Sequence, residues 1–184
     1  LNGRSIRYPR GKVLGGCTSV NGMIYMRGQA ADYDNWRQMG NVGWGWDDVL
    51  PYFLKSEDLH AGASPMHRSG GEWKVARQRL SWAILTAVQE GAKEFGILPR
   101  PDFNDGNNEG SGFFEVNQKN GVRWSTAKAF LRPARKRSNL RVLTHAHTER
   151  LELEGKQVRG VVYQHKGRRY QVRANAEVIL AAGA

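Results

Sequence analysis

Cysteine is nearly absent from this 184-residue chain, long apolar runs are missing, and acidic residues are scarce relative to basic ones. The single cysteine excludes an internal disulfide framework and a cysteine-rich zinc site. No run approaches the ~18 apolar residues that a membrane-spanning helix needs. The chain starts without Met or an apolar signal core and stops inside a predicted turn, so we expect a piece of a longer protein.

Basic residues outnumber acidic ones by 28 to 17, and the excess lies in the C-terminal third. Residues 1–119 carry 14 basic and 13 acidic side chains, whereas residues 120–184 carry 14 and 4. Such asymmetry is found in surfaces that bind nucleic acid or anionic membranes, and also in ordinary solvated faces. The basic residues are spread along predicted strands and loops without a nucleic-acid-binding motif, so no nucleic-acid partner is expected. A basic nucleic-acid- or anionic-surface-binding module is the alternative function.

Apolar periodicity in residues 1–137 indicates helices separated by polar loops. The residues after Gly16 are small and apolar, which predicts the start of a buried helix. The helix at 81–95 has the clearest pattern: Ser81 as cap, Gly96 as its end, and one apolar face that should pack against a neighbour. Further helices are expected at 30–39, after an N-cap at Asp47, and after an N-cap at Thr126, where Pro133 makes the helix short or kinked.

From residue 139 the period changes to that of strands. Alternation and Gly-containing turns predict an antiparallel meander, with strands at 140–143, 151–154, 158–163 and 170–172. The apolar run 177–182 leads into small residues and predicts a buried parallel strand entering a ligand-binding turn. The fold class is therefore mixed α/β (α+β).

The Gly15-Gly16 pair is the most informative local feature. Two glycines allow the backbone to approach a ligand closely, and the N–H groups after them suit a diphosphate or an electron-rich ring edge. A turn packed against a neighbouring element explains the pair equally well. The spacing matches neither a P-loop nor a GxGxxG motif. Asn21, among apolar residues, either binds a ligand or caps a turn.

Other reactive side chains predict no catalytic centre. Cys17 follows the glycines and is expected to be a small buried residue rather than a reactive thiol. His145 and His147 should share one face of a strand, but two histidines make an incomplete metal site, so no metal is expected. His60 and His67 lie in the polar loop 60–71 and are expected to be solvated.

Three segments together resemble the glucose–methanol–choline (GMC) oxidoreductase family, and most of all its choline-dehydrogenase-like branch. The segments are residues 11–28 (GKVLGGCTSVNGMIYMRG) with Asp32, Tyr33, Asp34 and Trp36, then residues 121–131 and 139–144, and finally residues 178–184. The first resembles a signature of the family almost position by position, and the resemblance covers essentially the whole chain.

The resemblance implies a flavin site built partly from this chain. Gly15, Gly16 and Cys17 would line the flavin diphosphate, with Val13 in the same cofactor-binding set. Asn21, Gly22, Met23 and Ile24 would run beside the isoalloxazine ring, and Thr148 would meet the adenine through its backbone. Val20 occupies the position where some members carry a histidine linked to FAD, so the FAD is expected to be non-covalent.

The resemblance also implies an activity. Members transfer hydride from an alcohol, here choline or a similar small primary alcohol, to FAD, and electrons then pass to quinone or oxygen. The GxGxxG unit and the catalytic histidine of the family lie outside this chain, so no catalytic residue is assigned and the rest of the parent chain is a required partner. The parent is expected in the cytoplasm, with membrane association left open.

The resemblance further implies a domain organisation. Residues 1–30 would belong to a partial Rossmann-like FAD-binding domain, 31–137 to a helical and looped substrate-side cap, and 138–184 to a meander and strand that return to the FAD-binding domain.

Overall fold

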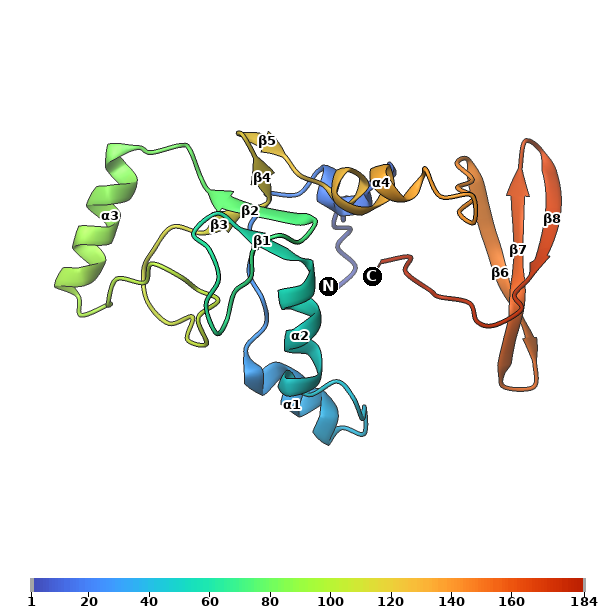
Figure 1. The fold of residues 1–184 in the computed structure, drawn as a ribbon, viewed down its shortest axis with the longest axis horizontal. Coiled ribbons are helices and arrows are strands. Elements are labelled where there is room, and N and C mark those ends of the chain that lie inside the picture. Colours follow the sequence, from blue (N-terminus) through green and yellow to red (C-terminus); the bar gives the residue numbers. More distant parts are fainter. Residues whose placement is uncertain (1, 184) are drawn as a thin grey trace. The chain divides into compact units, whose positions relative to one another are not determined.

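A computed structural model describes residues 2–183, which fall into two compact units that divide between Lys136 and Arg137 (Figure 1). The chain has the mixed α/β character predicted from its sequence. The first unit contains η1 (Gly16–Ser19), α1 (Ala30–Gln38), α2 (Trp46–Ser56), β1 (Glu57–Leu59), β2 (Trp73–Arg77), α3 (Ala83–Glu94), β3 (Glu115–Val116), β4 (Gln118–Lys119), β5 (Val122–Arg123), η2 (Ala127–Leu131) and α4 (Arg132–Ala134). The second contains β6 (Ala146–Glu154), β7 (Gln157–His165) and β8 (Arg168–Arg173).

A small sheet, in the order β1-β2-β3, forms the centre of the first unit. β1 runs parallel to β2, which pairs antiparallel with β3. The extended segment before α1 joins the free edge of β3, because Ile24 bridges Val116 and the Tyr25 N–H donates to the Glu115 carbonyl oxygen at 2.8 Å. Tyr25, Leu59 and Val75 form the apolar core against this sheet, with Val75 only 1% exposed.

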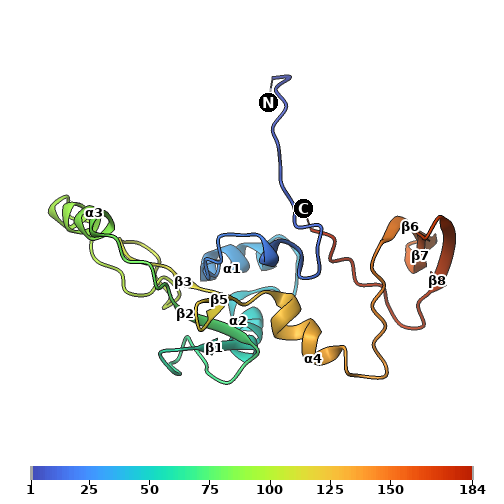
Figure 2. The ribbon, with the colours of Figure 1, turned by 90° about the horizontal axis from the view of Figure 1, so that it is seen from above.

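Helices α1 and α2 lie side by side and share an aromatic cluster (Figures 1 and 2). The Tyr33 ring lies 5.4 Å from that of Trp36, 5.6 Å from that of Trp46 and 5.9 Å from that of Phe53. The predicted N-cap at Asp47 is wrong by two residues. Helix α2 begins at Trp46 with Gly45 as its N-cap, and the Asp48 carboxylate accepts the Gly45 N–H at 3.0 Å.

Helix α3 confirms the predicted helix at 81–95 but not its packing. Gly96 ends it with φ of +82°, whereas Trp82 replaces Ser81 as the N-cap and makes no side-chain cap hydrogen bond. The apolar face is uncovered: the exposed fraction is 63% for Ile84 and 60% for Val88. The expectation that this face packs against a neighbour is wrong within the described residues, because its apolar side chains are largely exposed.

The second unit is the predicted antiparallel meander, in the order β6-β7-β8. Leu151 stands opposite Val161, and the stacked rings of Tyr163 and Tyr170, 5.5 Å apart, join β7 to β8. Val162 is its most buried apolar side chain, at 3% exposure. Alternation and turn chemistry are local signals, which is why the sequence predicts β6, β7 and β8 correctly.

Two predicted strands are wrong. Residues 140–143 and 177–182 form no strand, and Ile179 and Leu180 are 80% and 71% exposed. A buried parallel strand needs hydrogen-bonded neighbours, and none of the described residues supplies one for 177–182. His145 also lies outside the sheet: it precedes β6 with φ of +55°, so it does not share a strand face with His147.

The compact units do not test the functional division predicted from the resemblance. Residues 1–30 and 31–136 lie in one compact unit, so the boundary between FAD-binding segment and cap stays a prediction. Within residues 2–183, no helix is long and apolar enough to cross a membrane.

Candidate functional site

The Gly15-Gly16 turn has one packed and one open side. Gly15 has φ of +91°, and a Cβ on it would lie 2.5 Å from Ser19 Oγ and 3.1 Å from Ala127 Cβ. Gly16 has φ of +53°, and a Cβ there would meet nothing within 4 Å. The helix that follows is only the four-residue 3-10 helix η1, so the predicted start of a buried helix is wrong. Its Cys17 is exposed, so the expectation of a buried Cys17 is wrong too.

Thr18 and Thr126 join this turn to η2. The Thr126 N–H donates to Thr18 Oγ1 at 3.0 Å, and the two hydroxyl oxygens lie 3.1 Å apart. Both hydroxyls are within hydrogen-bond distance of the Gly15 carbonyl oxygen, at 2.5 Å from Thr18 and 3.2 Å from Thr126. Thr126 therefore does not cap its helix through its side chain as predicted, because its hydroxyl is committed to Gly15. The helix itself is short, as predicted, and passes from the π-helical turn η2 into α4 at Arg132, one residue before Pro133.

Asn21 caps a turn that Arg123 also holds. Asn21 Oδ1 accepts the Met23 N–H at 3.1 Å and a guanidinium N–H of Arg123 at 2.9 Å. The same Arg123 nitrogen donates to the Thr18 carbonyl oxygen at 3.2 Å. Met23 has φ of +64°, an uncommon conformation for a residue with a Cβ. The observed role of Asn21 is the turn-capping one of the two left open by the sequence.

The segment from Val20 to Ile24 presents an uncovered apolar strip. The exposed fractions are 62% for Val20 and 51% for Ile24, and a Cβ on Gly22 would meet nothing within 4 Å. Its backbone is held from behind, where the Met23 carbonyl oxygen accepts the Asn117 N–H at 2.8 Å. Val13, 55% exposed, lies on the approach to the same turn. A planar, partly apolar group fits such a surface.

The ninth predicted cofactor residue, Thr148, lies in the second unit. It stands in β6 opposite Tyr163, next to a register shift between Thr148 and Arg150. The other eight predicted residues lie together on the segment from Val13 to Ile24 in the first unit.

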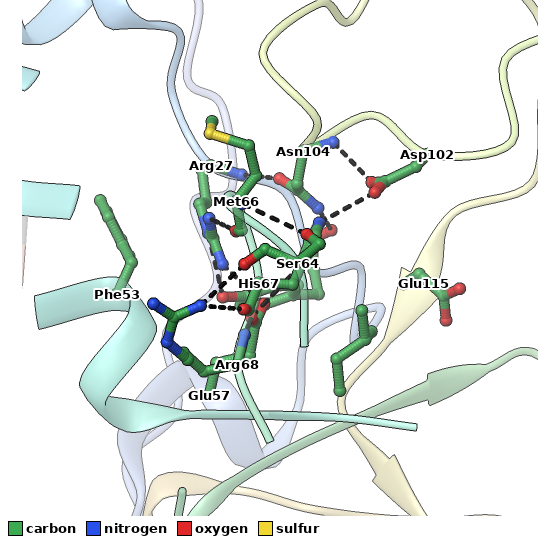
Figure 3. A network of polar contacts seen from close by, with 12 residues as sticks. Arg27, Phe53, Glu57, Ser64, Met66, His67, Arg68, Asp102, Asn104 and Glu115 are labelled. Atoms are coloured by element: carbon green, nitrogen blue, oxygen red, sulfur yellow. Dashed lines mark hydrogen bonds and ion pairs between the residues drawn. The ribbon is translucent and has the colours of Figure 1, made fainter. Parts of the chain in front are cut away.

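A buried polar network lies directly after that segment, and sequence reasoning missed it (Figure 3). Arg27 donates to Glu57 Oε1 at 2.6 Å, and both side chains are almost completely buried. His67 lies between two carboxylates: Nδ1 is 3.1 Å from each Glu57 oxygen, and Nε2 is 2.8 Å from Asp102 Oδ2. Asn104 completes the network by accepting the Arg27 N–H at 2.7 Å.

The prediction of a solvated His67 is therefore wrong, since the residue is only 4% exposed. Its partners are 10 and 35 residues away in sequence, in strand β1 and in the loop 99–112, so no spacing motif marks them. The one available signal was Arg27 itself, a charge at the end of an apolar stretch that must find a buried partner.

Electrostatics favour an ionised Glu57 and a protonated His67. The pKa of His67 is raised above its ordinary value, chiefly by the hydrogen bond to Glu57. Burial acts in the opposite direction, whereas the charges of Glu57 and Asp102 raise the pKa further. Burial alone would raise the pKa of Glu57, but hydrogen bonds from His67 and the Arg68 N–H, together with Arg27, bring it below its ordinary value. Burial raises the pKa of Tyr25 to about 12, so its hydroxyl stays neutral while Arg27 Nε donates to it at 3.2 Å.

Known proteins identify the chain. The sequence model of the GMC oxidoreductase family matches residues 1–184, the whole chain. The chain belongs to the GMC oxidoreductase family. It is 39% identical over 182 residues to an oxygen-dependent choline dehydrogenase of Rhizobium johnstonii and 41% identical over 183 residues to one of Brucella ovis. In both cases the match covers 99% of this chain and 33% of the relative, so the chain spans about a third of the length of these GMC proteins.

Solved structures of GMC-like proteins share the fold. Pyridoxine 4-oxidase from Mesorbium loti superposes with a TM-score of 0.82 at 31% identity, over 89% of this chain and 33% of that one. An FAD-dependent oxidoreductase from Chaetomium thermophilum superposes with a TM-score of 0.85 at 25% identity, over 95% of this chain and 33% of that one. The predicted resemblance to the GMC family and its choline-dehydrogenase branch is confirmed.

Proposed function

We propose that this chain forms a cofactor-lining part of an FAD-dependent GMC oxidoreductase that oxidises choline or a similar small primary alcohol. One observation carries the proposal: an exposed segment, open at Gly16 and Gly22, is anchored from behind by Thr126 and Arg123. A surface that is rigid but uncovered is what a preformed cofactor site requires. The choline dehydrogenase relatives supply the substrate class. The family membership favours this function over the basic-module alternative.

Different residues of this chain suit different parts of FAD. Gly16 and the exposed Cys17 suit the diphosphate, because the absence of a Cβ at Gly16 allows close backbone approach. Asn21, Gly22, Met23 and Ile24 suit the ring system, because Met23 and Ile24 supply apolar side chains and their backbone is held by Asn117. Gly15 would line the diphosphate beside Gly16, and Val13 belongs to the same cofactor-binding set. Thr148 would contact the adenine through its strand backbone. Bound FAD would supply the hydride acceptor, and this chain would position it.

In this proposal FAD is bound non-covalently, because Val20 stands where some family members carry a histidine linked to FAD. The hydrocarbon side chain of Val20, 62% exposed, has no nucleophilic atom to bond to a flavin. The catalytic base, expected to be a histidine, lies outside this chain, and the electron acceptor is quinone or oxygen. Binding must therefore come from non-covalent contacts, which makes it sensitive to added bulk at Gly16.

The experiment uses the complete gene product that carries this sequence. We expect the purified protein to show flavin absorbance, to release FAD into the supernatant on acid precipitation, and to bleach anaerobically on addition of choline. Gly16→Ala should reduce flavin occupancy. Gly155→Ala is the matched control, because Gly155 has φ of +61° and also no neighbour within 4 Å, but lies in the β6–β7 turn.

Four results would contradict the proposal in different ways. A protein without flavin that cannot be reconstituted with FAD rejects the cofactor. Flavin that stays with the precipitate rejects non-covalent attachment. A flavoprotein that bleaches with other alcohols but not with choline replaces the substrate, and equal occupancy in the two glycine variants rejects the assignment of Gly16.

A further inference from the structure

The geometry of His67 favours a proton on both ring nitrogens. Each nitrogen faces a carboxylate, Glu57 on one side and Asp102 on the other (Figure 3). A carboxylate is only an acceptor, so a neutral imidazole would direct a lone pair at one of them. The groups that face His67 are Glu57 from β1, Asp102 from the loop 99–112, Arg27 from the segment before α1, and Arg68, whose side chain donates to the His67 carbonyl oxygen at 3.0 Å.

Both carboxylates lead from His67 to the same piece of backbone. Glu57 binds the Arg27 side chain at 2.6 Å. Asp102 Oδ1 accepts the Asn104 N–H at 2.7 Å, and the Asn104 side chain then accepts the Arg27 N–H and donates to the Tyr25 carbonyl oxygen at 3.2 Å. Two separate chains of hydrogen bonds thus join the imidazole to residues 25–27.

Residues 25–27 continue directly from the exposed strip at residues 20–24. The strip ends at Ile24, which bridges Val116 and is followed at once by Tyr25. Arg123 holds the strip at Asn21, and Asn117 holds it at Met23. The position of its C-terminal end at Ile24 depends in addition on the anchoring of Tyr25 and Arg27.

We propose that His67, as an imidazolium between Glu57 and Asp102, is a positioning residue that anchors the Tyr25–Arg27 backbone and through it the cofactor-lining strip at residues 20–24. This rests on the proposed function for its effect on flavin, but the anchoring itself does not. Loss of the imidazolium charge leaves two carboxylates facing a single proton donor. The loop 99–112 and the segment 25–27 then loosen together, and the flavin dissociates faster.

The test compares the complete flavoprotein with His67→Gln, which cannot be charged. Backbone amide exchange of residues 23–27 and the rate of flavin release are measured from about pH 6 to pH 10, a range that extends well above the ordinary pKa of histidine. In the wild type both rates should rise beyond the ordinary effect of pH as the imidazolium is lost. In the variant both should be high throughout, with flavin release about tenfold faster at low pH.

His60→Gln is the matched control. His60 also binds a carboxylate, Glu115 Oε1 at 3.1 Å, but its side chain is 36% exposed and it lies outside the network. This variant should keep the wild-type pH profile. A wild-type profile in His67→Gln, or its loss in His60→Gln, overturns the proposal.

Asp102→Asn covers the case in which His67→Gln does not fold. The Asp102 side chain is 28% exposed, so the change is milder, and removing one carboxylate lowers the pKa of His67. The pH-dependent rises in amide exchange and in flavin release should both move to lower pH, a shift that a purely structural role would not produce. An unmoved midpoint overturns the proposal. If no flavin binds at any pH, the proposed function fails, and the amide exchange still decides whether His67 anchors residues 25–27.

Discussion

The hydroxyl oxygens of Thr18 and Thr126 lie 3.1 Å apart, although 108 residues separate the two threonines in the sequence. Together they surround the Gly15 carbonyl oxygen and tie η1 to the start of η2. The glycine turn is therefore held by a specific pair of side chains, and its exposed side is left available. The following predictions concern the complete gene product.

Replacing Thr126 by Val removes its hydroxyl from Gly15 at nearly constant volume. The Thr126 N–H still reaches Thr18, so the loss should be moderate, about 1 kcal/mol of unfolding free energy. Flavin affinity should fall as well, because the turn gains freedom. Thermal melts and flavin titration measure both, with Thr86→Val on the exposed helix α3 as control. An unchanged affinity would contradict the link between Thr126 and the turn.

Replacing Gly15 by Ala should be more damaging. The added Cβ would lie 2.5 Å from Ser19 Oγ, and moving Ser19 breaks its hydrogen bond to the Leu14 carbonyl oxygen. With the strain of φ at +91°, we expect a loss of about 2–3 kcal/mol. Gly96→Ala is the control: its backbone strain is comparable, with φ of +82°, but the added Cβ would meet nothing within 4 Å. The difference in stability between the two variants therefore measures the steric contact at Gly15. Equal melting temperatures for the two variants would exclude the predicted contact.

Glu57→Gln should abolish part of the acid sensitivity of the protein. Because the folded-state pKa of Glu57 lies below its ordinary value, the carboxylate stabilises the fold above the ordinary pKa, and this stability is lost as the pH falls through the folded-state pKa.

In the Glu57→Gln variant Arg27 and His67 lose their buried counter-charge, so stability at neutral pH should fall by about 3 kcal/mol. Melting temperature against pH, below about pH 6, should be flatter in this variant than in the wild type. Glu90→Gln, on the exposed surface of α3, is the control and should follow the wild type. If the melting temperature of Glu57→Gln fell on acidification as steeply as that of the wild type, other carboxylates would dominate the acid sensitivity.

Cys17 offers a chemical readout of the flavin site. Its thiol is exposed beside the open Gly16, so a neutral alkylating reagent should modify it readily in protein stripped of flavin. Bound FAD should slow that reaction, measured by mass spectrometry of the peptide. A cysteine introduced by Gly155→Cys serves as an internal reference whose reaction rate flavin should not change. Equal rates with and without FAD would place the diphosphate elsewhere.

Local patterns allowed the helices and the meander to be predicted. Alternating apolar residues and the turns at Gly155 and Gly167 specify β6, β7 and β8 with little help from distant residues. The Gly96 stop of α3 is likewise a local signal.

Long-range relationships could not be predicted in this way. His67 depends on Glu57 and Asp102, which reach it through irregular loops, and the Thr126 hydroxyl turned away from its helix because Gly15 lies beside it. The run 177–182 has strand-like residues but none of the described chain pairs with it, so its intrinsic preference is not realised. Packing partners, not propensity, decided each of these cases.

The meander has one further property that follows from the placement of its charges. β8 lies at one edge of its sheet, every residue in it is exposed, and it carries Arg168, Arg169 and Arg173. An unpaired strand edge invites pairing with another molecule, and like charges along the edge repel such a neighbour. Arg169 is paired with Glu149, so we expect Arg168 and Arg173 above all to disfavour edge-to-edge pairing of β8.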